Sequence, residues 1–241
     1  MEEIALADAA KRLKRGNKLL FTRDSACLQE LRGTICQQKH RTLVLWAFDC
    51  VSVPLQWLAQ TYPNEQRPGQ AVALCRQWAR GEIKMPAAKR ALLQAHAAAK
   101  AIEDPVAIAL FHAVGQACAT VHVETHALGL PFYELTAIVH HFGIANCTEP
   151  IEKKIVWYLH RLRYWQEHVD DPPLKWASFL LDDSRPNKEL LLLQGSGKKR
   201  RRFSPASFLS NNKSVRYTRG RFLLYITLKK PIIVLPAARR G

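Results

Sequence analysis

The chain has 241 residues, 48% of them hydrophobic, which is enough for one core domain of about 150 to 170 residues with appendages. Its formal net charge of +16 is concentrated in residues 174–241, which hold 16 Lys and Arg against 3 Asp and Glu, whereas residues 1–173 hold 20 against 17. Because residues 1–173 are nearly balanced in charge, the net charge of the whole chain gives no reason to infer that the folded part binds nucleic acid.

Cysteine usage and the N-terminal sequence indicate the compartment. Six cysteines are spread along the chain without a C-x-x-C pair, which favours buried thiols in a reducing environment over a disulfide framework. Residues 1–5 lack the basic-then-apolar pattern of a secretory signal. Outside residues 104–129 there is no long apolar stretch flanked for membrane insertion, and that stretch holds several polar residues. We therefore expect a cytoplasmic protein without a membrane partner.

The first segment, residues 1–40, predicts an N-terminal helical extension. A helical period of apolar residues covers residues 4–15. Asp24 can cap a second short helix, which runs through Ile35. We place the main helical domain after this extension, in residues 41–173.

Three helices are predicted next along the chain. Residues 41–62 form the first, and Pro54 should kink or divide it because proline removes a hydrogen bond to the preceding turn. A second helix opens at Arg67-Pro68 and stops at Gly81, and the third covers the alanine-rich residues 86–102.

Residues 104–129 predict the helix around which the domain is organised. Asp104 can cap it, Pro105 suits the first helical position, and Gly129 ends it. Its apolar residues surround the axis, and Glu124 is the only formally charged side chain after Pro105. A helix that is apolar on every side is a buried one. We therefore expect a long central helix, the most buried of an all-α multi-helix bundle.

Small residues along the central and preceding helices indicate two closely packed antiparallel hairpins. Folding the chain just before residue 105 brings His96 level with His112. Folding it near Leu130 brings His126 opposite Glu134. Because buried histidine and glutamate need partners, we expect both pairs to be neighbours.

Two further helices complete the predicted domain. They cover residues 131–142 and 148–168, and the second stops before Pro172-Pro173. No segment before that point alternates like a strand. Six to eight helices joined by short turns make an all-α bundle.

Residues 174–241 differ in composition from the preceding helices, with Ser, Asn, Pro and Gly stretches beside short apolar runs. Because no helical or strand period is sustained, we expect a basic, low-complexity and largely disordered tail, with at most a brief hydrophobic helix or strand. The run Lys198-Lys199-Arg200-Arg201-Arg202 can attract phosphates, although such runs are usually solvated. Whether this tail is a native functional part or a read-through extension stays open.

Several ordered motifs carry a family resemblance over residues 40–170, and the last helix, with Trp165-Gln166, adds to it. The motifs are Tyr62-Pro63, Arg67-Pro68, Trp78-Ala79-Arg80-Gly81-Glu82, Ala95-His96-Ala97, Asp104-Pro105, Gly115-Gln116-Ala117 and His122-Val123-Glu124-Thr125-His126. With these motifs the chain resembles the bacterial putative immunity proteins of the immunity-five-like group. The resemblance implies an all-helical, non-enzymatic domain that neutralises a toxin delivered between competing bacteria. It supplies no catalytic or toxin-contacting residues.

One pair of histidines has a spacing that metal sites use. On one helix, His122 and His126 stand four residues apart and can share an ion, and Cys118 extends the row by one turn. The glutamate that directly follows the first histidine in zinc proteases is missing. Histidines satisfied at a helix interface are the commoner explanation, so we predict no catalytic residue and no cofactor.

A ligand cleft is a second chemical possibility. His140-His141 and four aromatic residues of the last helix, among them Trp157 and Trp165, could line it, although core packing is the usual role of such rings. No G-x-S-x-G motif or phosphate-binding glycine loop occurs.

Three classes of function remain. A toxin-binding immunity protein is favoured by the resemblance. A metal-dependent helical enzyme or metal-binding protein would need a cluster of His96, His112, His122, His126 and Glu134. A nucleic-acid-associated protein would depend on the tail alone. The sequence does not identify the toxin, the contact surface or the oligomeric state.

Overall fold

The computed structural model describes residues 6–171 and 174–197. No strand occurs in these described residues, so the predicted all-α bundle is confirmed. The helices are α1 (Ala7–Lys14), η1 (Ala26–Leu28), α2 (Gln29–Cys36), α3 (His40–Cys50), α4 (Ser52–Thr61), α5 (Arg67–Ala79), α6 (Met85–Ala98), η2 (Ala99–Ala101), α7 (Pro105–Ala119), η3 (Glu124–His126), α8 (Gly129–Phe142), α9 (Thr148–Glu167), α10 (Ser178–Leu181) and α11 (Lys188–Gly197).

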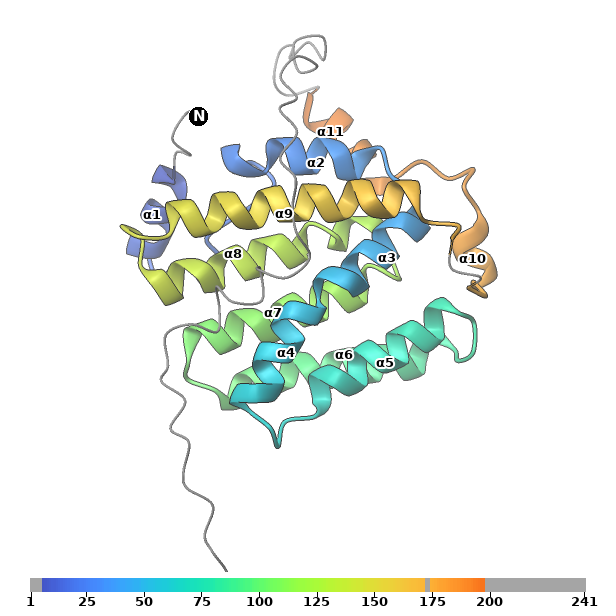
Figure 1. Cartoon of the computed structure of the whole chain (residues 1–241), viewed down its shortest axis with the longest axis horizontal. Coiled ribbons are helices and arrows are strands. Elements are labelled where there is room, and N and C mark those ends of the chain that lie inside the picture. The colour runs from blue at the N-terminus through green and yellow to red at the C-terminus, as the bar shows by residue number, and fades with distance from the viewer. Residues whose placement is uncertain (1–5, 172–173, 198–241) are drawn as a thin grey trace, which may run out of the picture. The chain divides into compact units, whose positions relative to one another are not determined.

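The helix α7 lies at the centre of this arrangement. It packs against α8 on one side and against α4, α5 and α6 on the other (Figure 1). On the far side of α8, α9 packs against α2 and α3. As predicted, Asp104 caps α7, accepting a hydrogen bond of 3.0 Å from the amide of Val106.

The central helix is shorter than predicted, because it ends at Ala119 and not at Gly129. Three of the next four residues are β-branched, which lowers helix propensity, and Val123 is extended with a φ of −159°. The hydroxyl of Thr120 donates to the carbonyl of Gln116 at 3.1 Å. The chain therefore turns through residues 120–128 before α8 begins.

The expectation that the central helix is the most buried one is also wrong. In α7, 9 of 15 residues are buried, compared with 10 of 14 in α8 and 8 of 11 in α3. The core is thus shared among these three helices. It includes the fully buried Trp46, whose indole N–H donates to the carbonyl of Tyr158 at 3.1 Å.

The predicted division of the helix over residues 41–62 is confirmed. The chain breaks at Val51 into α3 and α4, and Pro54 lies in the first turn of α4, where its missing N–H costs no hydrogen bond. The run His40–Thr61 is long and apolar enough to cross a membrane by composition, but 61% of its most apolar window is buried inside the fold. Such burial is typical of a core helix.

The N-terminal extension packs into the same unit as the rest of the domain. Leu20 and Phe21 are almost fully buried, and the amide of Leu20 donates to the hydroxyl of Thr136 in α8 at 3.1 Å. The helix α2 packs against α9. The two helices predicted for this extension are present, and residues 6–40 also contribute to the core.

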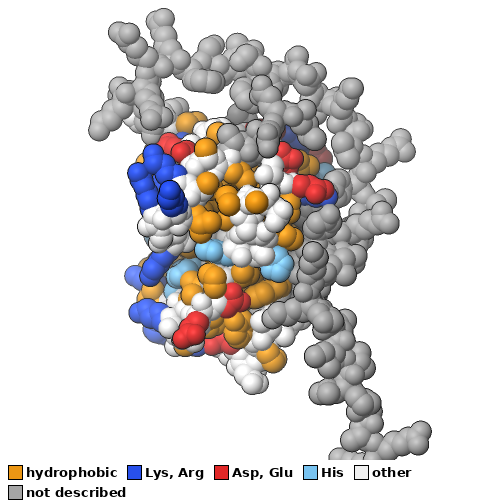
Figure 2. Space-filling model, turned by 90° about the vertical axis from the view of Figure 1, so that its left-hand side faces the viewer, with side chains coloured by type: hydrophobic (Ala, Val, Ile, Leu, Met, Phe, Trp, Pro, Cys, Tyr) orange, Lys and Arg blue, Asp and Glu red, His pale blue; other side chains and the backbone are white. Residues whose placement is uncertain are grey.

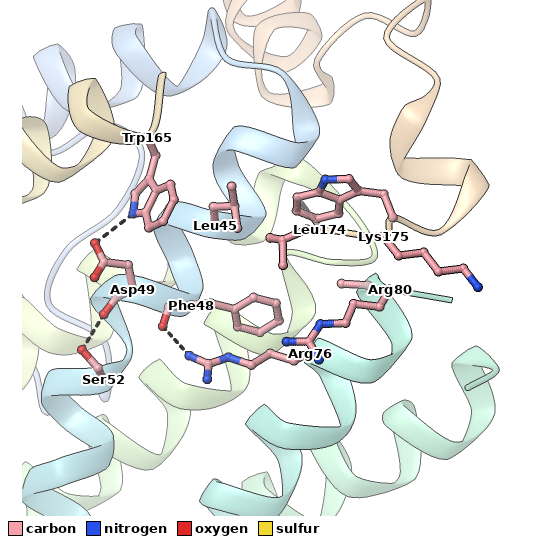
Figure 3. A pocket seen from close by; sticks show the side chains of 11 residues that line it. Leu45, Phe48, Asp49, Ser52, Arg76, Arg80, Trp165, Leu174 and Lys175 are labelled. Atoms are coloured by element: carbon pink, nitrogen blue, oxygen red, sulfur yellow. Dashed lines mark hydrogen bonds between the residues drawn. The ribbon is translucent and has the colours of Figure 1, made fainter. Parts of the chain in front are cut away.

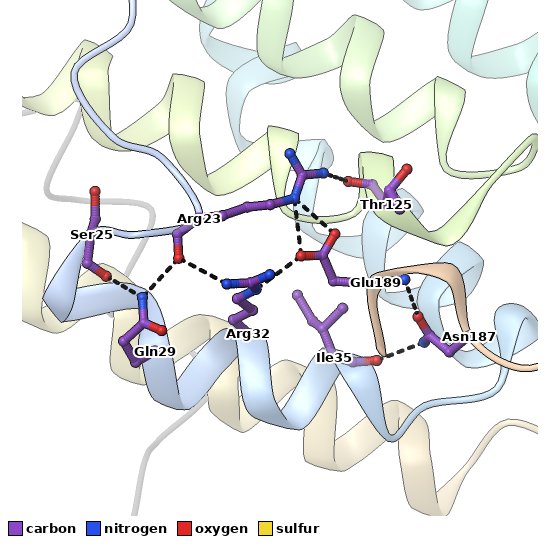
Figure 4. Close-up of polar contacts among 8 residues, drawn as sticks. All are labelled: Arg23, Ser25, Gln29, Arg32, Ile35, Thr125, Asn187 and Glu189. Atoms are coloured by element: carbon purple, nitrogen blue, oxygen red, sulfur yellow. Dashed lines mark hydrogen bonds and ion pairs between the residues drawn. The ribbon is translucent and has the colours of Figure 1, made fainter. Parts of the chain in front are cut away.

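The prediction of a largely disordered tail from residue 174 onward is wrong for residues 174–197, which we call the C-terminal segment. This segment forms α10 and α11 and is anchored by a buried carboxylate, that of Glu189 (Figure 4). Glu189 accepts from the Nε of Arg32 at 2.9 Å and from the Nε of Arg23 at 2.9 and 3.0 Å. The rest of the predicted tail, residues 198–241, lies outside the described residues.

A second buried polar residue fixes the start of α11. The side-chain oxygen of Asn187 accepts from the amide of Glu189 at 2.9 Å, as a helix cap does. Its amide nitrogen donates to the carbonyls of Ile35 at 2.9 Å and Gln38 at 3.1 Å, at the end of α2. These contacts satisfy both ends of the Asn187 side chain, so they fix α11 on α2.

Candidate functional site

The predicted neighbourhood of His96 and His112 is confirmed. Their Nδ1 atoms lie 3.0 Å apart and their ring centroids 5.2 Å apart. The ring of His112 also packs on Tyr133 of α8, with the centroids 5.1 Å apart. Two protonated imidazoles would direct N–H groups at each other, so this contact requires at least one neutral ring.

Close packing of the hairpins, predicted from their small residues, is also confirmed. A Cβ atom on Gly115 would lie 2.2 Å from the Cε1 of His96, and one on Gly129 would lie 2.3 Å from the Oε1 of Gln116. That same oxygen lies 2.8 Å from the Nδ1 of His126, which must therefore carry the donated proton. Glycine at these two positions makes room for polar side chains.

The predicted pairing of His126 with Glu134 is wrong. Glu134 lies 2.5 Å from the Nζ of Lys154, and its other oxygen accepts a hydrogen bond from the hydroxyl of Tyr158. All three of these side chains are buried. Because the chain turns through residues 120–128, before the predicted pivot, the register between the two helices differs and Glu134 faces α9.

The spacing of His122 and His126 that metal sites use does not bring the two side chains together on one helix. His122 lies in the turn that follows α7, and His126 lies in η3, so the two are not on one helix. His122 is exposed and stacks on Trp78 with a centroid distance of 6.3 Å, while His126 is occupied by Gln116. Among the described residues there is no group of three or more His, Cys, Asp or Glu that could hold a metal ion.

The environment keeps the half-buried histidines neutral. Burial lowers the pKa of His96 to about 4, with a smaller contribution from the neighbouring charges of His112 and His126. Burial also lowers the pKa of His112, with a contribution from the charge of Lys18. It lowers the pKa of His126 as well, with contributions from the neighbouring charges of His122 and Arg23. Figure 2 shows histidine side chains in the middle of one face, largely among uncharged and apolar groups. Neutral histidines in such surroundings are packing and hydrogen-bonding groups.

The alternative of a ligand cleft lined by His140-His141 and the aromatic residues of the last helix does not assemble as one site in the described structure. Tyr158 is fully buried, whereas Tyr164 stacks on His168 with the centroids 4.3 Å apart. Trp165 lines one of the described cavities, whereas Tyr158 and Tyr164 line none of them. The predicted residues therefore belong to separate contacts.

The cavity that Trp165 lines is formed by α3, α5, the end of α9 and residues 174–176 of the C-terminal segment (Figure 3). Its volume is about 300 Å³. We call it the α5 pocket and define it by its apolar residues Leu45, Phe48, Trp165, Leu174 and Trp176 and its cationic residues Arg76, Arg80 and Lys175. It combines an apolar interior with positive charge at the edge.

Asp49 is the carboxylate of the α5 pocket, and its partners neutralise it. One of its oxygens lies 2.5 Å from the Nε of Arg161 and accepts from the indole N–H of Trp165 at 2.9 Å. Arg76 is held by its hydrogen bond of 3.1 Å to the carbonyl of Phe48 (Figure 3). The remaining charge of the pocket is positive.

The C-terminal segment closes the α5 pocket through a backbone contact with the end of α5. The amide of Ala177 donates to the carbonyl of Ala79 at 2.8 Å. Gly81 follows α5 with a φ of +75°, and a Cβ atom there would lie 3.4 Å from the Cα of Ala177. Glycine at this position thus supplies both the left-handed turn and the room for the segment.

Comparison with known families identifies the bundle that carries this pocket. The sequence profile of the Imm-5 like putative immunity proteins matches residues 33–161, more than half of the chain. The chain belongs to this family. No curated protein and no solved structure is significantly similar to it.

The immunity-family region runs from within α2 into α9, so it includes Phe48, Arg76 and Arg80. The residues that close the α5 pocket, among them Leu174 and Trp176, lie beyond it. The pocket is therefore built jointly by the family domain and by a segment outside the matched region.

Sequence reasoning missed the α5 pocket. Arg76 and Arg80 stand one helical turn apart before Gly81, and this spacing places them on one face of α5. That signal was available from the sequence. Lys175 and Trp176 gave none, because they fall in the stretch that was assigned to a disordered tail.

Proposed function

We propose that this chain is a non-enzymatic immunity protein that binds a cognate bacterial protein toxin and neutralises it by direct contact. The observation that carries the proposal is the family match over residues 33–161. An all-helical fold presents rigid surface residues on several helices, which suits binding to a folded partner. We further propose that it acts in the cytoplasm, where its six cysteines stay reduced.

The surroundings of the histidines support a structural role for them. His96 shares a hydrogen bond with His112, and His126 has Gln116 as its partner. The carboxylate of Glu134, which the enzyme hypothesis needs in the same cluster, is held by Lys154 and Tyr158. These side chains already have protein partners, which favours binding through the surface over chemistry at a histidine cluster.

Co-expression tests the proposal. The reading frames beside this gene are searched for a large secreted protein with a variable C-terminal domain. The full chain is then produced together with that domain, and growth is compared with cells that produce the domain alone. We expect growth to be restored and the two proteins to elute as one complex in size-exclusion chromatography. Restored growth without a complex, or a complex without restored growth, would contradict neutralisation by contact.

A further inference from the structure

We propose that the α5 pocket receives an acidic segment of the toxin, with an apolar side chain in the cavity and carboxylates on Arg76, Arg80 and Lys175. This inference rests on the proposed function and adds to it a contact surface and the chemistry of the partner. A volume of about 300 Å³ lies at the lower end of the range of ligand pockets and has room for one large side chain.

The interior of the pocket is apolar and aromatic. Phe48 and Trp176 supply rings, and Leu174 extends into the space between the helices (Figure 3). Burying an aliphatic or aromatic side chain here removes its surface from water at roughly 25 cal/mol per Å². Aromatic residues with arginine beside them are also the residue types that dominate the energy of protein interfaces.

The cations at the edge have free hydrogen-bonding capacity. Arg76 uses one nitrogen for the carbonyl of Phe48, which leaves other guanidinium donors available. Arg80 lies 3.7 Å from Glu82, a distance too long for a strong hydrogen bond, and both side chains are almost half exposed. Within the described part of the chain, no carboxylate forms an ion pair with Arg76 or Lys175. Three positive side chains therefore line the edge of the pocket, where carboxylates of a partner can pair with them.

A second hollow continues the same surface. It shares Arg80, Lys175 and Trp176 with the α5 pocket and has a volume of about 380 Å³. It is lined by Trp78 and Phe179, whose ring centroids lie 5.6 Å apart. The two adjoining hollows have aromatic linings and share cationic residues. This arrangement suits an extended polypeptide in which apolar and acidic side chains alternate.

Charge argues against the chain's own C-terminal residues as the occupant. Residues 198–241 hold 13 Lys and Arg and no Asp or Glu. Such a segment is repelled by Arg76, Arg80 and Lys175. Nucleic acid needs a longer track of positive charge than these three groups supply, so an acidic polypeptide is the occupant that matches both the apolar interior and the short cationic edge.

Peptide binding to the full-length protein tests this chemistry directly. The probe is a fluorescent heptapeptide with a central phenylalanine flanked by aspartates, and its analogues carry asparagines in place of aspartates or alanine in place of phenylalanine. We expect saturable binding of the first peptide and binding at least about 10-fold weaker for each analogue. The proposal would be overturned if all three peptides bound equally well, or if the aspartate peptide did not bind.

Protein variants locate the binding. Replacing both Arg76 and Arg80 by glutamine should weaken binding of the aspartate peptide by about 10-fold. The matched control replaces Arg200 and Arg201 by glutamine, which removes the same charge from the basic run and should leave binding within about 2-fold. A larger loss in the control would assign the binding to the tail and overturn the pocket. Lys175→Gln, on an exposed side chain, repeats the test without altering α5.

Two further outcomes would identify another occupant. If an unlabelled single-stranded oligonucleotide displaces the peptide, and if its binding is weakened more than peptide binding by the Arg76 and Arg80 double variant, nucleic acid is the ligand. If Arg76→Gln changes the sedimentation of the protein alone, a second copy occupies the pocket. Either result would overturn an acidic toxin segment.

The toxin itself separates failure of this inference from failure of the proposed function. If the unaltered chain protects cells while the Arg76 and Arg80 double variant protects equally well, the pocket is wrong and the immunity function stands. If the unaltered chain neither protects nor forms a complex, the function itself is wrong. Protection that is lost in the double variant, with its melting temperature unchanged, supports both.

Discussion

Folding changes the ionisation of His96, because burial lowers its pKa from an ordinary value of 6.5 to about 4. Between these two values the unfolded chain binds more protons than the folded one, so the free energy of unfolding decreases as the pH falls. The lowered pKa values of His112 and His126 act in the same direction. This is the opposite sign to that expected from the predicted pairing of His126 with Glu134.

Urea unfolding at pH 7.5 and at pH 5 measures this effect. We expect lower stability at pH 5 and a smaller difference between the two pH values for His96→Gln, which cannot take up a proton. A His96→Gln variant with the same pH dependence as the unaltered chain would show that His96 does not contribute to it.

Gly115 tests the close approach of α6 and α7. The Cβ atom of Gly115→Ala would meet the ring of His96 at 2.2 Å, so either the ring or the helix must move, at a cost of roughly 1 to 3 kcal/mol. Gly33→Ala in α2 is the matched control, because no atom lies within 4 Å of the added methyl group and alanine favours a helix. Thermal unfolding of the two variants checks this, and equal melting temperatures would contradict the packing described for Gly115.

At the scale of the elements, α11 depends on one buried carboxylate. Glu189→Ala leaves Arg32 buried without its anion, which should cost about 3 to 5 kcal/mol. Glu103→Ala serves as the control, because Glu103 is exposed in the connection before α7 and such changes stay within about 0.5 kcal/mol. Denaturant unfolding of both variants measures the difference. A stability loss no larger for Glu189→Ala than for Glu103→Ala would remove the anchoring role.

Helix boundaries set by proline and glycine were predictable from the sequence, whereas the break after Ala119 was not. The start of α7 at Asp104-Pro105 and the end of α5 near Gly81 follow from local stereochemistry. Apolar residues recur past Thr120, at Val121, Val123 and Leu128, and this recurrence concealed a turn that β-branched residues and tertiary contacts favour. That one boundary decided which partner Glu134 meets.

The C-terminal segment was missed for a different reason. Glu189 lies more than 150 residues from its partners Arg23 and Arg32, so no local pattern indicates that its charge is buried and matched. The composition of residues 174–197 resembles a linker when it is read alone. A few long-range contacts, and not a helical period, decide that it is ordered.

At the scale of the whole molecule, the sequence motifs were sufficient for the all-α fold and for the family, which the match over residues 33–161 confirms. They were insufficient for a site. The metal hypothesis assumed that His122 and His126 share one helix, and the α5 pocket requires residues from three distant parts of the chain. Sites assembled from distant segments depend on tertiary packing, which motif spacing does not report.

Stoichiometry tests the central claim most directly. The toxic domain, at fixed concentration well above the expected Kd, is titrated with the purified full-length chain while its toxic activity is measured, with and without a chelator. Neutralisation by contact predicts that activity falls linearly to zero at one equivalent of the chain and that the chelator has no effect. Loss of activity with a small fraction of an equivalent would show that the chain acts as a catalyst, and loss that the chelator prevents would show that it needs a metal. Either result would contradict neutralisation by contact.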